Sequence, residues 1–167
     1  YNAFDGTYGG LWRRNGRAPQ KLVGVGFTAQ GTFKGMPYKR TCFDPEFDWV
    51  FEGIDSPIFG DFGYSGNGAA GFELDRVDPK LAPGYNITFL AQSFAVDENF
   101  ILVPEEQLTH LTNLSGGPEN EVKRADMIYF EVPNGGRVFS VGSITFCGSL
   151  PWNNFDNKVS RLLLNVL

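Results

Sequence analysis

The chain has 167 residues, among them 21 glycines and 16 phenylalanines, and it carries a formal net charge of −5. This length suits one domain with a sizeable core, and the abundance of glycine and aromatic residues favours strands and turns over helices. The acidic charge and the lack of any basic tract argue against nucleic acid and anionic membrane surfaces as partners. The sequence shows no signal peptide and no apolar run of transmembrane length.

Two cysteines, Cys42 and Cys147, are too few for a disulfide framework. We interpret them as two buried free thiols in a reducing compartment, which predicts a cytoplasmic location, although they would pair if the fold brought them together. Cys147 also follows an apolar run and resembles half of a nucleophile elbow, with Thr145 where that motif has glycine. A Cys147–His110 dyad is therefore an alternative to a structural thiol.

The first 124 residues read as a β-rich, loop-rich part. Residues 1–20 and 30–46 are rich in turn residues, and residues 53–71 contain six glycines, which forbid a stable helix. Apolar and alternating runs predict strands over residues 21–29, 72–76, 86–94 and 100–103, with either a strand or one helical turn over 47–51. Residues 104–111 begin with proline and carry acids nearby, which favours a short helix.

Residues 125–167 read as a closing strand pair and a helix. The turn at residues 133–136 predicts that a buried strand over 125–132 pairs antiparallel with a strand ending near residue 146. A helix begins near Asp156, capped by Asp156 or by an asparagine just before it. Its apolar residues recur at helical spacing and form one face, comprising Val159, Leu162, Leu163, Val166 and Leu167.

The segment Gly66-Asn67-Gly68-Ala69-Ala70-Gly71 matches the spacing of a dinucleotide-binding loop. Such a loop needs a strand before it and a helix after it, and neither is expected here. The more plausible role of these glycines is to let the backbone pass close to a neighbouring segment or site.

Three acids stand out by their surroundings. Glu73 and Asp75 are two residues apart in an alternating segment, directly after the glycine-rich loop, and so lie on the same face of it. Glu131 lies in the most apolar strand, where a carboxylate is paired with an arginine, faces solvent at an edge, or serves as a tuned acid or base. Near the start of the chain, Trp12 and Arg13 form either a wall of a site or a packed tryptophan with a charged rim.

Metal ligands are few on composition alone. One histidine and two cysteines cannot make an ordinary structural zinc site. Carboxylates and tyrosines are hard oxygen ligands that suit ferric iron, but six tyrosines and nineteen acids do not point to a particular set.

Three long blocks, in order, resemble the C-terminal region of the large (β) subunit of N,N-dimethylformamidase and its relatives. They read TYGGLWRRNGRAPQKLVGVGFTAQG, FEGIDSPIFGDFGYSGNGAAGFELDR and ADMIYFEVPNGGRVFSVGSITFCGSLPWNNFDNKVSRLLLNVL. The resemblance implies an amidohydrolase that splits formamides into formate and an amine. It also implies a glutamine-amidotransferase-like (flavodoxin-like) α/β fold, with iron held by two tyrosines and one glutamate in the complete family protein.

The resemblance carries over to particular residues only in part. The resemblance implies that the tyrosine ligands lie upstream of the matching block, and Thr7 stands where the family often has an acid. It therefore implies iron in the complete family protein but no complete iron site in this chain. Glu131 and Glu73 match acids of the family pattern and are the expected catalytic residues. Trp12 and Arg13, in the first block, are the expected substrate-binding residues.

Together these observations predict a strand-rich α/β chain. We expect it to be a single domain, or the C-terminal part of a larger glutamine-amidotransferase-like domain with a glycine-rich β insertion. The expected function is hydrolysis of a small amide at a non-peptide C–N bond, with the upstream polypeptide or another subunit as partner. The alternative is a non-catalytic binding or assembly domain that keeps the family scaffold.

Overall fold

The computed structural model describes residues 12–82, 84–95, 100–106 and 119–167. Its helical elements are η1 (Trp12–Asn15), α1 (Gln20–Val23), η2 (Pro45–Phe51), α3 (Glu119–Val122), α4 (Phe146–Ser149), η3 (Trp152–Phe155) and α5 (Lys158–Val166). Its strands are β1 (Gly26–Gln30), β2 (Tyr38–Arg40), β3 (Ile58–Phe59), β4 (Glu73–Arg76), β5 (Thr88–Phe94), β6 (Ile101–Leu102), β7 (Arg124–Val132) and β8 (Gly136–Ser140).

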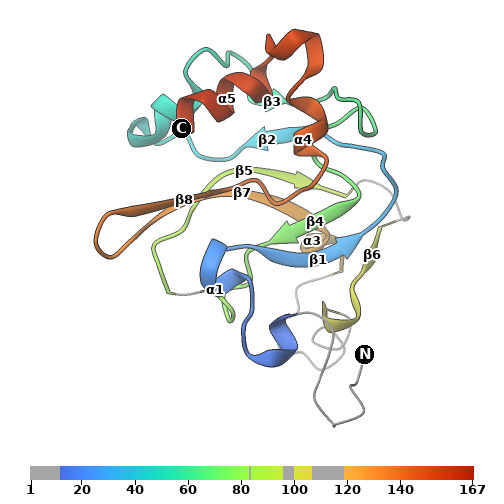
Figure 1. The fold of residues 1–167 in the computed structure, drawn as a ribbon, viewed down its shortest axis with the longest axis vertical. Helices are drawn as coiled ribbons and strands as arrows, with labels where there is room; N and C mark the ends of the chain where they lie inside the picture. The colour runs from blue at the N-terminus through green and yellow to red at the C-terminus, as the bar shows by residue number, and fades with distance from the viewer. Residues whose placement is uncertain (1–11, 83, 96–99, 107–118) are drawn as a thin grey trace.

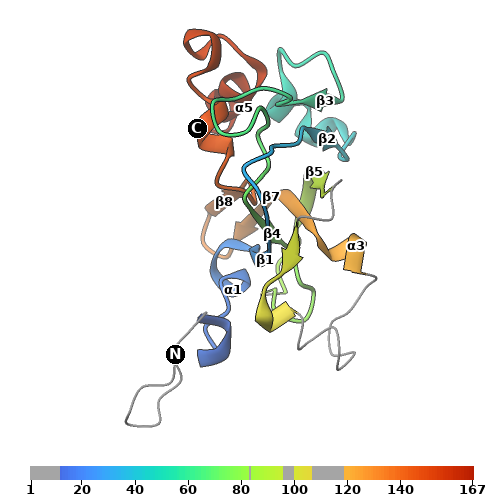
Figure 2. The ribbon, with the colours of Figure 1, turned by 90° about the vertical axis from the view of Figure 1, so that its right-hand side faces the viewer.

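The strands form two sheets, one with the order β4-β1-β6 and one with the order β3-β2-β5-β7-β8. Every pairing among the described strands is antiparallel. In both ribbon views α5 lies near β2 and β3, far from α1, with the two sheets between them (Figure 1, Figure 2). The expected strand-rich α/β class is therefore confirmed, and within the described ranges the chain contributes antiparallel sheets.

Strand β7 lies between β5 and β8 in the larger sheet, and its apolar run is buried on both faces. Met127 and Tyr129 point into the main core, whereas Ile128 and Phe130 point into a second, smaller core. The hairpin to β8 turns through the three residues 133–135, of which Asn134 and Gly135 have positive φ (78° and 89°). The predicted antiparallel pair is confirmed.

The second strand of that pair is shorter than predicted. It ends at Ser140, and Phe146, predicted to lie in the strand, begins α4. Gly142 explains the interruption, because it has a φ of +70° and an added Cβ would lie 2.7 Å from the carbonyl oxygens of Asp75 and Asp126. The chain turns there to pass against β4 and β7.

The strand predicted over residues 21–29 is confirmed only in its second half, as β1. Residues 20–23 form α1 instead, and Gly24, with a φ of 79°, ends this helix before β1 begins. Residues 47–51, predicted as either a strand or one helical turn, belong to the 3₁₀ helix η2, whose first turn is capped by Asp44. Apolar runs this short do not distinguish strand from helix by themselves.

The closing helix α5 is confirmed, and its cap is Asn157, one residue after the expected Asp156. Asn157 Oδ1 accepts a hydrogen bond from Ser160 N at 2.9 Å, and its amide donates to the carbonyl oxygens of Leu150 and Trp152. Val159 and Leu162 are fully buried in the main core. The helix therefore covers one end of the larger sheet (Figure 1).

The glycine-rich loop packs backbone against backbone. A Cβ on Gly66 would lie 1.2 Å from the carbonyl oxygen of Phe33, and one on Gly68 would lie 2.2 Å from the carbonyl carbon of Gly35. Gly35 N donates to Gly66 O at 2.7 Å. The segment leads into strand β4 and not into a helix, so the predicted close backbone approach is confirmed.

Among the described residues, no helix is both long and apolar enough to cross a membrane.

Candidate functional site

Strand β4 places Glu73 and Asp75 on the same side, with Leu74 and Arg76 on the opposite side. Burial first, and then the nearby negative charge of Glu73, together raise the pKa of the Asp75 carboxyl to about 7. Within the described part of the chain, no group donates a hydrogen bond to the Asp75 carboxylate. Asp75 can therefore gain or lose a proton near neutral pH, as a general acid or base must.

The backbone leading into this pair is strained. Phe72, directly before Glu73, has a φ of 59°, which is uncommon for a bulky residue. Its ring stacks on Phe33, with ring centroids 4.2 Å apart and nearly parallel planes. Strain of this kind persists where surrounding contacts impose it and is frequent at functional sites.

Asp75 shares its surroundings with two other titratable groups. The pKa of Tyr38 is raised well above its usual value, mainly by burial and then by the charges of Asp75 and Asp126. Asp126 is fully buried and accepts hydrogen bonds at 2.8 Å from Val77 N, Gln92 Nε2 and Arg124 Nε. Asp126 is thus held by three hydrogen bonds, and Asp75 is the acid of this group with the raised pKa.

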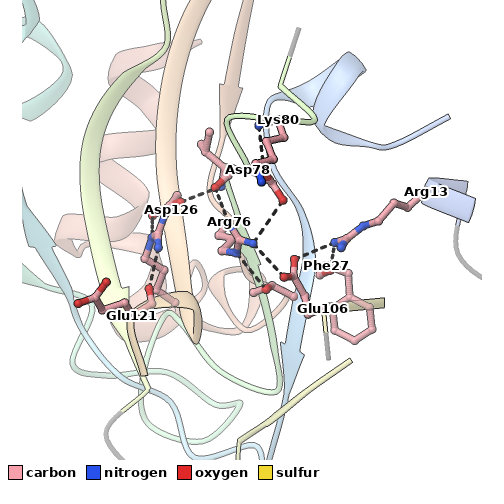
Figure 3. A network of polar contacts seen from close by, with 11 residues as sticks. Arg13, Phe27, Arg76, Asp78, Lys80, Glu106, Glu121 and Asp126 are labelled. Atoms are coloured by element: carbon pink, nitrogen blue, oxygen red, sulfur yellow. Dashed lines mark hydrogen bonds and ion pairs between the residues drawn. The ribbon is translucent and has the colours of Figure 1, made fainter. Parts of the chain in front are cut away.

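The other side of β4 carries a buried ion-pair network (Figure 3). Arg76 Nη2 lies 2.9 Å from Glu106 Oε2 and 3.4 Å from Asp78 Oδ2, and the three side chains are nearly inaccessible to solvent. Arg13 Nη2 completes the network through Glu106 Oε1 at 3.0 Å and also donates to Phe27 O. The network ties η1 and the segment after β6 to β4.

Of the two expected substrate-binding residues, Arg13 is engaged in this network and Trp12 is 66% exposed. One donor of Arg13, Nη1, is buried without a partner, so the guanidinium is not fully satisfied. Neither residue lines the groove that contains Glu131. Their role toward a substrate stays a prediction.

Glu131 lies at the exposed end of β7, one residue beyond the buried run. Its Oε1 is 3.2 Å from Arg137 Nε on β8 and accepts a hydrogen bond from the Tyr129 hydroxyl at 3.0 Å. It lines an open groove of about 610 Å³. Glu131 is therefore both paired with an arginine and open to solvent, two of the three arrangements expected for it.

The structure does not bring Glu131 and Glu73 together. Glu131 belongs to the five-stranded sheet and Glu73 to the three-stranded sheet, and Glu73 is not among the residues that line the groove. Glu73 lies instead beside Asp75, and Glu131 lies beside Tyr129. The two expected catalytic acids thus mark two separate places.

Sequence reasoning missed the surroundings of Glu131. Phe47 and Trp49 of η2 each contact the Tyr129 ring edge-on, with centroids 5.8 and 5.9 Å apart, and Glu46 lines the same groove. The spacing of Tyr129 and Glu131, two apart on a strand, places both on one side. The η2 residues lie some eighty residues earlier in the chain, so the sequence around Glu131 gives no indication that they line the same groove.

No three His, Cys, Asp or Glu side chains lie together as metal ligands among the residues that the structure describes. The expected iron ligands include two tyrosines, so iron binding in the complete protein stays a prediction. Thr7 and His110, named in the iron and dyad predictions, lie outside the described residues. Both cysteines are free, but Cys147 is exposed and Cys42 half-buried, so the prediction that both are buried was wrong.

Comparison with known proteins gives consistent matches. The family described as N,N-dimethylformamidase beta subunit-like, C-terminal, matches residues 1–157. The N,N-dimethylformamidase beta subunit of Paracoccus aminophilus is 40% identical and that of an Alcaligenes species 38% identical, each over 98% of this chain. The chain spans 22% of the length of each of these relatives.

Proposed function

Because the chain belongs to the N,N-dimethylformamidase beta subunit-like, C-terminal family, we propose that it forms part of an amidohydrolase that splits a small formamide into formate and an amine. The observation that carries this proposal is the match to two dimethylformamidase beta subunits over 98% of the chain. The reaction type is hydrolysis of a non-peptide C–N bond in a linear amide.

The chemistry needs a group that moves protons at neutral pH. Water adds to the formyl carbon and loses a proton, and the nitrogen must take up a proton before the C–N bond breaks. A carboxyl with a pKa of about 7 serves both needs, as Asp75 does beside Glu73. We assign Glu73 and Asp75 as the proton-transfer pair, and Glu131, which lies in the other sheet, is not assigned to the bond-breaking step.

A chimera tests this assignment. The corresponding segment of the Paracoccus aminophilus subunit is replaced by residues 1–167, the protein is assembled as the relative requires, and formate release from dimethylformamide is measured. We expect activity in the chimera and a loss of about 100-fold in kcat for Glu73→Gln, the scale of general acid–base catalysis. Glu52→Gln is the matched control, because Glu52 is an exposed acid outside both the Glu73–Asp75 pair and the groove beside Glu131.

A correctly assembled but inert chimera would contradict the proposed activity, and an undiminished Glu73→Gln chimera would contradict the role of Glu73. Metal analysis of the active chimera addresses a further proposal, that iron in the complete protein is held by residues outside the described part. Trp12→Leu in the chimera tests the proposed substrate contact, since its loss should raise KM without a matching fall in kcat.

One observation favours the alternative function, an assembly domain. The outer side of α5 and the preceding loop form an apolar groove of about 360 Å³, with Phe155, Leu164 and Leu167 at 65%, 63% and 94% exposure. Exposed apolar patches of this kind mark interaction sites. In this reading the chain holds the upstream polypeptide or another subunit, and Leu164→Glu dissociates the assembly whereas Glu73→Gln leaves catalysis intact.

Two further proposals follow from the family. We propose that upstream residues supply the parallel strands of a glutamine-amidotransferase-like domain, to which these antiparallel sheets are appended. A structure of a longer chain tests this. We also propose a cytoplasmic location, supported by two cysteines that remain free thiols.

A further inference from the structure

The groove beside Glu131 combines aromatic rings with carboxylates. Its floor is β7, which presents Tyr129 and Glu131 on one side, and its wall is η2, which presents Phe47 and Trp49. The planes of the Phe47 and Trp49 rings are inclined to the Tyr129 ring by 67° and 81°. Both rings therefore meet Tyr129 at a steep angle and not as a parallel stack, and Trp49, which lines the groove, is 39% exposed.

The charge of the groove is negative. It is lined by three carboxylates, those of Asp44, Glu46 and Glu131, and by one guanidinium, that of Arg137. The negative charge also affects the Tyr129 hydroxyl. Burial, followed by the hydrogen bond to Glu131, raises the pKa of Tyr129. The charges of Glu131 and Glu46 raise this pKa as well, and the charge of Arg137 lowers it. Two acids from distant segments thus converge on one phenol.

The guanidinium of Arg137 does not close the groove. Its side chain is 70% exposed and that of Glu131 is 61% exposed, so their ion pair is screened by water and weak. An incoming cation can compete with Arg137 for Glu131 at little cost.

The kind of cation follows from the lining. The carboxylates do not gather with other His, Cys, Asp or Glu groups into a metal-binding cluster within the described residues, so an inorganic ion finds no chelating set. Aromatic faces beside carboxylates suit a cation that carries methyl groups, because the rings attract the charge and also cover the apolar surface. We infer that this groove binds an alkylammonium ion.

The choice of dimethylammonium as the natural ligand rests on the proposed function, in which the amine of a dimethylated formamide leaves in protonated form. The ligand class rests on the groove alone. A site for the amine, some distance from the Glu73–Asp75 pair, would hold the product after the C–N bond has broken, and Glu131 would contact its N–H groups.

The test is titration of the 167-residue chain with dimethylammonium chloride at constant ionic strength, followed by amide and indole NMR shifts. We expect saturable shifts at Trp49, Tyr129 and Glu131, none with sodium chloride, and much weaker ones with neutral dimethylformamide. Trp49→Leu and Glu46→Gln should each weaken binding by about fivefold, the scale of one cation–π or charge contact. Trp152→Leu, at a tryptophan of similar exposure (36%) outside the groove, and Glu52→Gln are the matched controls.

Arg137→Gln gives the sharpest readout, because removal of the competing guanidinium should tighten binding several-fold, a change that a merely structural role would not produce. Non-saturable shifts, or equal affinity in Trp49→Leu, Glu46→Gln and the parent chain, would overturn the inference. Formate release by the chimera is measured separately. If the chain binds dimethylammonium but the chimera releases no formate, only the proposed function is contradicted. If the chimera releases formate but the chain does not bind dimethylammonium, only this inference is contradicted.

Discussion

Arg13 and Glu106 are 93 residues apart in sequence, and an ion pair of 3.0 Å joins them in a buried site. Glu106 also pairs with Arg76, so one carboxylate bridges two guanidinium groups, and Asp78 adds a second negative charge beside Arg76 (Figure 3). The basic residue that was expected to bind a substrate is thereby committed to holding the N-terminal part of the described chain against β4.

We expect Glu106→Gln to lower the free energy of unfolding by about 3–5 kcal/mol, because it removes the carboxylate partner of Arg13 and leaves buried Arg76 with only its longer pair to Asp78. Urea denaturation followed by circular dichroism measures the change. Asp55→Asn is the control, since it breaks the pair with Lys158 where the Asp55 side chain is 87% exposed, and it should leave the free energy of unfolding nearly unchanged. Equal effects of the two substitutions would contradict the buried network.

Alanine substitutions at Gly66 and Gly135 distinguish the cost of a steric overlap from the cost of a left-handed backbone. Both have positive φ (+84° and +89°), but a Cβ on Gly66 would overlap Phe33 O, whereas one on Gly135 meets nothing within 4 Å. We expect Gly135→Ala to cost about 1 kcal/mol, from the left-handed backbone alone, and Gly66→Ala to cost at least about 2 kcal/mol more. Thermal unfolding of the two variants measures the difference, and similar melting temperatures would refute the close approach of the loop.

Asp75 makes stability depend on pH in a defined direction. Its pKa is about 7 in the folded chain and close to 3.8 when unfolded, so the folded state holds an extra proton between these values. The contribution of this extra proton to the free energy of unfolding is complete below about pH 4 and is lost as the pH rises through about 7. We expect Asp75→Asn, which mimics the protonated acid, to remove this part of the pH dependence.

The measurement for Asp75 is a series of urea denaturations from pH 4 to pH 8. Asp55→Asn, at a fully exposed acid whose pKa the bond to Lys158 lowers, should leave the decline between pH 4 and pH 7 in place. A parent chain whose stability is flat or rises across this window, with no difference in Asp75→Asn, would show that Asp75 is ionised throughout.

Asn157 both begins α5 and ties it to the preceding loop. Asn157→Ala removes the acceptor for Ser160 N and the donors to Leu150 O and Trp152 O, and we expect a loss of about 1–2 kcal/mol. Asn157→Asp keeps the acceptor and loses the amide donors, so it should fall between Ala and the parent chain. Chemical denaturation ranks the free energies of unfolding of the parent chain and the two variants. If Asn157→Asp is as destabilised as Asn157→Ala, the loss of stability comes from the contacts with the loop and not from the helix cap.

Much of the architecture was predictable because the signals were local. The turn at Asn134-Gly135 and the apolar run of β7 predict a hairpin without reference to the rest of the chain, and the helical spacing of Val159 and Leu162 predicts α5. Residues 20–23 and 45–51 were harder, because a run of four or five apolar residues fits a helix as well as a strand. Phe146 left the predicted strand because Gly142 turns the chain against β4 and β7.

The candidate sites were predictable only in part. The sequence singled out Glu73, Asp75 and Glu131, since an acid beside an alternating or apolar run is unusual, and it paired Glu73 with Asp75 on one side of β4. It could not place Glu131 apart from Glu73, because that depends on which sheet each strand joins. The pKa of Asp75 depends on burial beneath segments far away in sequence, to which its own neighbours give no clue.

The sequence by itself determined the family, the strand-rich class, the hairpin and closing helix, and the acids worth considering, because each rests on residues close together along the chain. Only the tertiary structure decided that Arg13 belongs to a buried network, that the two acidic places are separate, and that Phe47 and Trp49 meet Tyr129. These depend on contacts between segments tens of residues apart, whose positions are set by the packing of two sheets and not by local preference.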